Sequence, residues 1–145
     1  MDAELIMEAL FAQTEGLVWD TPARGFQARS RRVKMWADAP TQPALYQVEH
    51  DEFAAKKRGL PYKWEMEAEW VVYQNVAKDA EALGQRENNL ILNALRGKLR
   101  PEPGIKRCTL GGLVYDAFFD GRVFKDSGDL DGQGVIVMPI KILVP

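Results

Sequence analysis

The sequence of 145 residues predicts an α+β fold: a single domain, residues 1–145, in which an antiparallel sheet of four or so strands carries two to three helices packed on one face. Apolar residues recur at helical spacing near the N-terminus and again after residue 86. Between and after these segments, β-branched and aromatic residues indicate strands that follow one another in adjacent pairs. Strands that are consecutive in the sequence usually pair antiparallel, and this leaves the helices to cover one face of the sheet. A chain of this length buries roughly 68–70% of its unfolded surface, which is enough for a sizeable core.

The N-terminal third begins with an amphipathic helix over Asp2–Gln13, because its apolar residues fall at helical spacing. Gly16, Pro22 and Gly25 interrupt the pattern that follows. A basic segment comes next, and its pattern fits a helix and a strand equally well. The cationic residues of this segment are Arg24, Arg29, Arg31, Arg32 and Lys34.

Two strands are expected in the middle of the chain, over Ala44–Asp51 and Tyr62–Tyr73, because both segments alternate and are rich in β-branched and aromatic residues. The charged link between them, residues 52–61, contains a Gly and ends in a Pro, and we expect an exposed loop there. A polar stretch, Asn75–Arg86, leads into a helix of about 13–15 residues that presents one apolar face and ends at prolines. The residues of that face are Ile91, Leu92, Leu95 and Leu99, and the prolines are Pro101 and Pro103.

The last third returns to strands, over Leu113–Lys125 with a turn at Asp120–Gly121, and over Gly134–Val144. The segment between them, Ser127–Gly134, is rich in turn-forming residues. Pro139 lies inside the final apolar strand and cannot donate a hydrogen bond to a neighbouring strand. We therefore expect an edge strand or a bulge at this proline.

Composition and charge argue against several classes of protein. The formal net charge of −2 does not suit a general nucleic-acid-binding protein. The N-terminus is acidic where a signal peptide is basic, and no run of about 18 apolar residues is present, so we expect no membrane partner. Cys108 is the one cysteine of the chain, which excludes an internal disulfide and fits a reducing compartment such as a cytoplasm.

Signals for catalysis or metal binding are few. The one histidine, His50, lies on an expected strand between two acids, and is best interpreted as a partly exposed strand residue. One His and one Cys cannot form the usual zinc sites. The loop that begins at Ser127 resembles a calcium loop only superficially, because Met138 stands where the bidentate Glu is required. We expect no catalytic residue, no metal and no cofactor.

Three glutamates, Glu65, Glu67 and Glu69, occupy alternate positions of the second expected strand. Such residues lie on one face about 6.6–7 Å apart, whereas catalytic carboxylates usually converge from different elements. The opposite face is expected to pack under the helices and carries Trp64, Met66, Ala68 and Trp70. The acidic strip is therefore interpreted either as a solvated surface or as the wall of a channel.

Several features of the C-terminal third occur together: Thr109-Leu110-Gly111-Gly112, a strand through Gly121, a loop ending in Gly132-Gln133-Gly134, and the closing run Pro139–Pro145. Upstream, Pro43-Ala44-Leu45-Tyr46 enters a strand, and Ser30-Arg31-Arg32 precedes it. With these features the chain resembles the small tail-terminator proteins of long-tailed, lambda-like bacteriophages, also called tail-completion or minor tail proteins. The likeness covers most of the chain and is looser before Pro43.

The resemblance implies a structural, non-enzymatic virion protein that is assembled in the host cytoplasm and resides in the phage tail. Proteins of this family form a ring, typically a hexamer, that caps the head-proximal end of the tail tube. The ring stops tube polymerisation and provides the surface to which the head attaches. The implied partners are other copies of the chain, the tail tube protein and head–tail connector proteins, while DNA passes through without sequence-specific binding.

In such a ring, Glu65, Glu67 and Glu69 would line the bore or lie near it, because carboxylates repel DNA phosphates. Assembly contacts are expected from the basic segment and the final strand, at Arg29, Arg31, Arg32, Lys34, Pro139 and Lys141. Two alternatives stay open. One is another head–tail connector, stopper or tail-tube subunit, and the other is a small-molecule-binding domain or hydrolase that uses the glutamate face.

Overall fold

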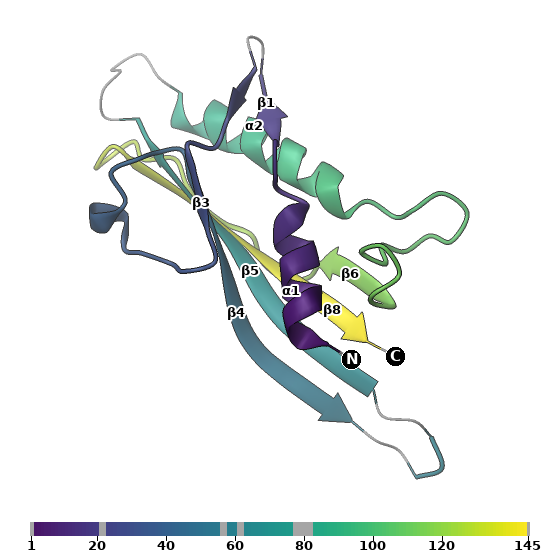
Figure 1. Ribbon diagram of the computed structural model, residues 1–145. Coiled ribbons are helices and arrows are strands. Elements are labelled where there is room, and N and C mark those ends of the chain that lie inside the picture. The colour runs from purple at the N-terminus through teal and green to yellow at the C-terminus, as the bar shows by residue number, and fades with distance from the viewer. Residues whose placement is uncertain (1, 21–22, 56–57, 61–62, 77–82, 145) are drawn as a thin grey trace.

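The computed structural model describes residues 2–20, 23–55, 58–60, 63–76 and 83–144. In this part of the chain, a sheet of six strands is covered on one face by two α-helices, which gives a mixed α/β arrangement (Figure 1). The expectation of four or so strands was too low, because the basic segment adds a short strand and the segment before Ser127 forms two strands. None of the described helices is long and apolar enough to cross a bilayer.

Three long strands form the centre of the sheet: β4 (Ala44–Ala55), β5 (Lys63–Asn75) and β8 (Gln133–Val144). β5 runs antiparallel to both of the others, so that Glu69 lies opposite Val48 on one side and Pro139 on the other. The three expected strands are thus confirmed. β4, however, continues to Ala55 through an irregularity between Glu49 and Glu52, so the first part of the expected loop is strand.

Short strands complete the sheet on both sides. β3 (Ala28–Ser30) pairs in parallel with the start of β4, which departs from the expected antiparallel pattern. β6 (Asp116–Phe119) and β7 (Phe124–Asp126) both pair antiparallel with β8, on the side away from β5. A separate two-stranded sheet is formed by β1 (Val18–Trp19) and β2 (Arg24–Gly25).

Pro139 lies on a central strand whose pairing with β5 shows no register shift, so the expectations of an edge strand and of a bulge in that pairing were both wrong. β6 and β7 leave a gap between them along β8, and the backbone N–H of Asp120 donates to the Pro139 carbonyl there, at 3.2 Å. The nitrogen and carbonyl of one residue in an antiparallel strand point to the same side, so the proline nitrogen also faces this gap. Gly121, with φ of +107°, packs over the ring, where an added Cβ would lie 3.4 Å from Pro139 Cγ. The missing donor therefore falls where no ladder hydrogen bond is required.

The two helices begin and end close to the expected positions. α1 (Ala3–Ala12) is capped by the Asp2 side chain, which accepts from the Leu5 N–H at 3.1 Å. α2 (Gly84–Arg96) continues into a 3₁₀ turn, η2 (Gly97–Leu99). Its first turn lies inside the stretch that was expected to precede the helix.

The main core lies between both helices and one face of the sheet. The face of α2 that was predicted to be apolar is buried there. Met66, Ala68 and Trp70 of β5 are buried on this face, and Trp64 packs against it, as the alternation predicted. The buried residues of β8 on the same face are Ile136, Met138, Ile140, Ile142 and Val144.

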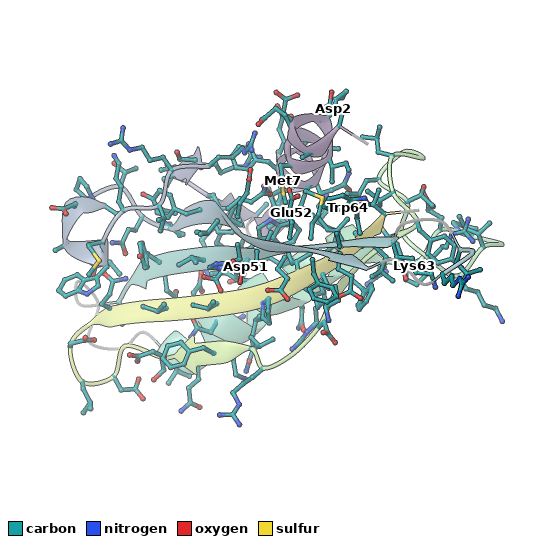
Figure 2. All side chains as sticks on the ribbon, turned by 90° about the horizontal axis from the view of Figure 1, so that it is seen from below. Asp2, Met7, Asp51, Glu52, Lys63 and Trp64 are labelled. Atoms are coloured by element: carbon teal, nitrogen blue, oxygen red, sulfur yellow. The ribbon has the colours of Figure 1, made fainter. Side chains whose placement is uncertain are left out.

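A buried glutamine fixes α1 to the sheet. Gln47 is 1% exposed and accepts a hydrogen bond from the Trp70 indole N–H at 3.1 Å. Its own amide donates to the Met7 carbonyl at 2.9 Å. Figure 2 shows Met7 on the side of α1 that faces the sheet. Because both polar groups of the side chain have partners, its burial is compatible with a stable core.

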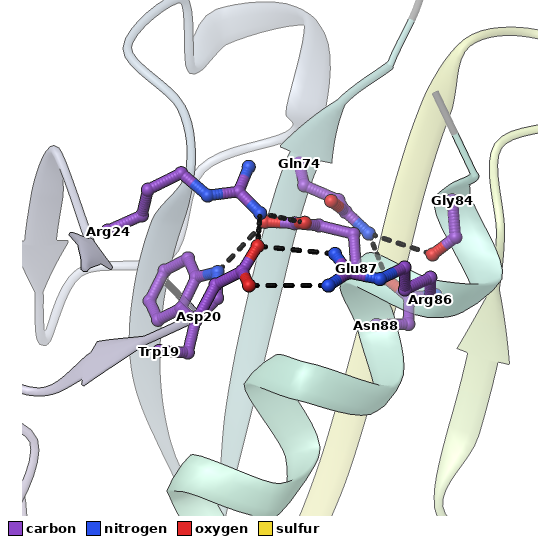
Figure 3. A network of polar contacts seen from close by, with 8 residues as sticks. All are labelled: Trp19, Asp20, Arg24, Gln74, Gly84, Arg86, Glu87 and Asn88. Atoms are coloured by element: carbon purple, nitrogen blue, oxygen red, sulfur yellow. Dashed lines mark hydrogen bonds and ion pairs between the residues drawn. The ribbon is translucent and has the colours of Figure 1, made fainter. Parts of the chain in front are cut away.

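The N-terminal end of α2 is held by a polar network (Figure 3). The Glu87 carboxylate accepts from the Trp19 indole N–H at 2.8 Å and from the Arg24 guanidinium at 2.5 Å. Asp20 pairs with Arg24 at 2.8 Å and with Arg86 at 3.2 Å. The small β1–β2 sheet is thereby connected to the helix that covers the main core.

Candidate functional site

The sheet face opposite the helices divides into two ends along β5. At one end, which we call the closed end, Ala39, Ala44, Tyr46, Val71 and Tyr73 form a second buried apolar cluster. The other end, which we call the acidic end, contains Glu65, Glu67 and Glu69 of β5, together with His50, Asp120 and Lys141.

The three glutamates share the face away from the helices, as the alternation predicted. Glu67 is exposed, whereas Glu65 and Glu69 are half-buried. The Lys141 ammonium lies 3.8 Å from the Glu65 carboxylate and 3.2 Å from that of Asp120. Nε2 of His50 lies 2.9 Å from the Glu69 carboxylate. Glu67 has no comparable ion pair within the part of the chain that the structure describes.

The acidic end carries a net negative charge. Its four carboxylates face one ammonium group and one imidazole, so the negative charges outnumber the positive ones whichever form the imidazole takes. A hydrogen bond that the Lys141 ammonium donates to Asp120, supported by the charges of Asp120 and Glu65, raises the pKa of Lys141. Lys141 therefore remains a cation and is a poor nucleophile or base.

A shallow cavity of about 240 Å³ lies within the acidic end. His50 beside Glu69 resembles an oriented base, because a carboxylate can hold an imidazole in one position. Among the described residues that line this cavity, none is a Ser, Thr or Cys that could act as a covalent nucleophile. In the described ranges, no three His, Cys, Asp or Glu side chains converge as a metal site requires. The excess of carboxylates over cations makes this surface repel anions.

Two of the expected assembly residues make contacts within the chain. The Arg29 guanidinium donates to the Phe11 carbonyl at 2.7 Å and to Thr14 Oγ1 at 2.9 Å, and it lies over the Phe11 ring. Its burial lowers its pKa. Arg31 pairs with Glu4 of α1 and, at 2.5 Å, with Glu49 of β4. These two arginines connect α1 and the residues that follow it to β3 and β4, so both guanidinium groups already have partners within the chain.

Arg32 and Lys34, by contrast, are exposed. They lie in the segment that connects β3 to β4, and three apolar side chains beside them, Val33, Met35 and Trp36, are exposed as well. The sequence predicted assembly contacts in this segment at its cationic residues only. The apolar residues interleaved with the basic ones were the signal that could have identified it as a contact surface, because a purely solvated segment does not need them.

The six expected assembly residues thus fall in three places. Pro139 and Lys141 lie in or beside the acidic end, Arg32 and Lys34 lie near the closed end, and the remaining two arginines lie beside α1.

A comparison of the sequence with models of protein families found no match, and a comparison with curated protein sequences found none either.

Proposed function

We propose that this protein is a structural component of a phage virion that forms a hexameric ring on the head-proximal end of the tail tube. The ring stops tube polymerisation and provides the head-attachment surface. The observation that carries the proposal is the acidic end: a sheet face that no described segment covers, with carboxylates at regular spacing along β5, the middle one of the three long strands. The resemblance of the sequence to tail-terminator proteins supports the same conclusion.

A bore lined by the acidic end would let DNA pass without adhering. Much of the free energy of DNA binding comes from counterions that leave the DNA for the solution when lysine and arginine side chains neutralise its phosphates, and carboxylates cause no such release. They also repel the phosphates electrostatically. The pairs Glu65–Lys141 and Glu69–His50 would hold two of the carboxylates in place, while Glu67 contributes a charge that no described ion pair balances.

The sheet also offers an edge to which a partner such as the tail tube protein or a connector protein could dock. β3 pairs with β4 only from Ala44 to Tyr46, so the outer edge of β4 beyond Tyr46 has no strand beside it in the described ranges. An unpaired edge is a common place for a neighbouring chain to dock. Phe53, near the end of this edge, is exposed and would contribute apolar area to such a contact.

Electron microscopy of the purified protein, alone and with the tail tube protein of the same genome, tests the proposal. We expect rings of one diameter with a central hole, and tubes that stop growing when the rings are added. Filaments formed by the protein alone would instead indicate a tail-tube subunit. A monomer that holds a small organic molecule at the acidic end would indicate the binding or hydrolytic alternative.

The bore is tested by Glu67→Lys. In a hexamer this change introduces a new cation in every subunit at one level of the bore, so the rings should bind duplex DNA at low salt and release it steeply as salt rises. Wild-type rings should not retain DNA under the same conditions in a co-sedimentation assay. Glu8→Lys, an exposed residue of α1, is the matched control and should leave DNA binding unchanged. Equal DNA binding by both variants would contradict a bore at the acidic end.

A further inference from the structure

The segment Arg32–Trp36, which we call the apolar loop, displays side chains that normally avoid water. Met35 is 68% exposed, and Trp36 and Val33 are each nearly half exposed. They lie close together in the chain, just before and at the first residue of the 3₁₀ turn η1 (Trp36–Asp38). Single exposed apolar residues need no explanation, but a local group of three, which includes a tryptophan, is typical of a binding surface.

The apolar loop is held in place by contacts with the sheet. The Tyr73 hydroxyl donates to the Lys34 carbonyl at 2.7 Å. Ala39, which follows η1, is 2% exposed and belongs to the closed end. Gln42 donates to the Ala39 carbonyl at 2.8 Å and exchanges hydrogen bonds with Gln133 of β8. A loop fixed at these points loses little conformational entropy when a partner binds it.

A pocket of about 420 Å³ lies at the opposite end of β5, and we call it the end pocket. Its surface is mainly apolar, and Tyr115, which is 51% exposed, stands beside it with the Arg107 guanidinium 4.3 Å from the ring centre. The residues that line the end pocket are Lys63, Trp64, Glu65, Tyr115, Leu143 and Val144. Aromatic side chains bury about 150–250 Å² each and dominate the energetics of interfaces, so an open, mainly apolar pocket of this kind suits one.

The apolar loop and the end pocket cannot meet within one chain. Tyr73, which contacts the loop, and Trp64, which lines the pocket, are nine positions apart on β5. A strand rises about 3.4 Å per residue, so about 30 Å separates the two features. A projection at one end and a recess at the other are what a head-to-tail contact between identical subunits requires.

We infer that the apolar loop of one copy inserts Trp36 and Met35 into the end pocket of the next copy, and that this contact joins the subunits of the ring. The inference rests on the proposed ring function. A second copy is the chosen occupant because one chain carries both halves of the contact, an exposed apolar segment and an apolar recess, at opposite ends of β5. The charge of the pocket rim is mixed, since Lys63 and Glu65 both line it, and the exposed Glu67 follows. Pairing of Arg32 and Lys34 with these acids, and repulsion from Lys63, would fix the register more than they add affinity.

Separate substitutions in the loop and the pocket test the contact. Trp36→Ser removes the inserted ring, and Tyr115→Arg adds bulk and charge at the pocket, while both positions are exposed enough for the chain to fold. Loss of a central aromatic residue typically weakens an interface by about 30-fold or more, so each variant should be monomeric at concentrations where the wild type assembles. Leu130→Ser, at a fully exposed apolar residue outside both features, should assemble like the wild type.

Mixing the two variants gives the sharpest test. A subunit with Trp36→Ser still has an intact pocket, and a subunit with Tyr115→Arg still has an intact loop. Exactly one of the two possible contacts between them is therefore complete. An equimolar mixture should form heterodimers and no larger species in native mass spectrometry, while circular dichroism should show that both variants are folded. A symmetric contact, in which both copies use the same surface, does not give this pattern.

The outcomes separate the contact from the ring function. If the wild type forms rings, and both variants form them equally well or the mixture gives no heterodimer, then this contact is wrong while the proposed function stands. If the wild type never associates, alone or on tubes, the ring function fails too. A small molecule retained in the end pocket of a monomeric wild type, seen as a mass adduct, would overturn both.

Discussion

The closed end and the acidic end lie on the same face of the same strands, yet one is interior and the other is surface. At the closed end, Val71 and Tyr73 are buried and pack with Tyr46 of β4 under the segment that connects β3 to β4. At the acidic end, which begins at Glu69, the same alternate positions of β5 carry carboxylates that pair with neighbours at the surface. A strand can therefore change from two-sided to one-sided burial within two residues.

The difference shows that the burial of the outer face of β5 depends on whether another segment covers it, and not on a break in the strand or in its pairing. β5 is continuous across both ends, and its pairing with β8 has no irregularity. The connection between β3 and β4 reaches over only the closed end, where it places Ala39 against the sheet. The acidic end has no such cover in the described ranges, which leaves it free to face solvent, DNA or another subunit.

The strongest test of this difference extends the glutamate row into the closed end. Val71→Glu would place a carboxylate two positions beyond Glu69, at a residue that is only 7% exposed. Because a buried, unpaired charge is costly, we expect a loss of about 3 kcal/mol or more in the free energy of unfolding, measured by urea denaturation.

The reverse change supplies the matched control. Glu67→Val at the acidic end should alter the free energy of unfolding by no more than about 0.5 kcal/mol, because Glu67 is exposed and has no described ion pair. If the two substitutions were equally tolerated, the two ends would not differ in burial. The contrast would then have no physical basis.

A smaller effect is expected from Tyr73→Phe, which removes the hydrogen bond between the closed end and its cover. The Tyr73 hydroxyl donates to the Lys34 carbonyl at 2.7 Å. Its loss should lower the free energy of unfolding by about 1 kcal/mol, since a typical intramolecular hydrogen bond contributes that much. Amide hydrogen exchange should become faster in the segment 33–39 and stay unchanged in β8. Unchanged exchange in that segment would show that this hydrogen bond does not hold the cover.

The same residue predicts a dependence on pH. Burial, with a smaller contribution from Tyr46, raises the pKa of Tyr73 above its usual value of about 10. The unfolded chain therefore loses this proton first as the pH rises, so the stabilisation is fully present below about pH 10 and is lost as the pH passes through the raised pKa. The stability difference between the wild type and Tyr73→Phe should thus be the same at about pH 8 and about pH 9 and smaller at about pH 11. A constant difference would contradict the burial of this hydroxyl.

Much of the fold follows from patterns in the sequence. The helical spacing located both helices, and the alternation of Trp64, Met66, Ala68 and Trp70 identified the face of β5 that packs under them. It also placed the glutamates on the other face. These predictions succeed because one-sided burial leaves a clear period in the sequence.

The closed end could not be located in the same way. Trp70-Val71-Val72-Tyr73 is an unbroken apolar run, and such a run indicates burial on both faces without showing what provides the second cover. That cover is a connection without a regular period. The exposure of Trp36 depends on how this connection lies on the sheet, which is a long-range property of the fold.

Pro139 illustrates the same limit. The rule that proline avoids central strands is local, and it fails here because β6 and β7 together leave the gap that the proline needs. The presence of that gap depends on the turn at Asp120 and Gly121, which was expected from the sequence. Its alignment with Pro139, however, depends on the register of β8 with both short strands. Register between segments cannot be obtained from the pattern of either segment alone.

The smallest effect is expected at the pair formed by His50 and Glu69, at the boundary between the two ends. Both side chains retain contact with solvent, so their interaction at 2.9 Å should behave as a surface ion pair or hydrogen bond. In a double-mutant cycle with His50→Gln and Glu69→Gln, we expect a coupling free energy of about 0.5 kcal/mol or less. A coupling of about 2 kcal/mol would mean that this pair is shielded from water like the closed end. Val71→Glu would then extend an environment that is already dry, and the boundary between the ends would lie closer to Glu67.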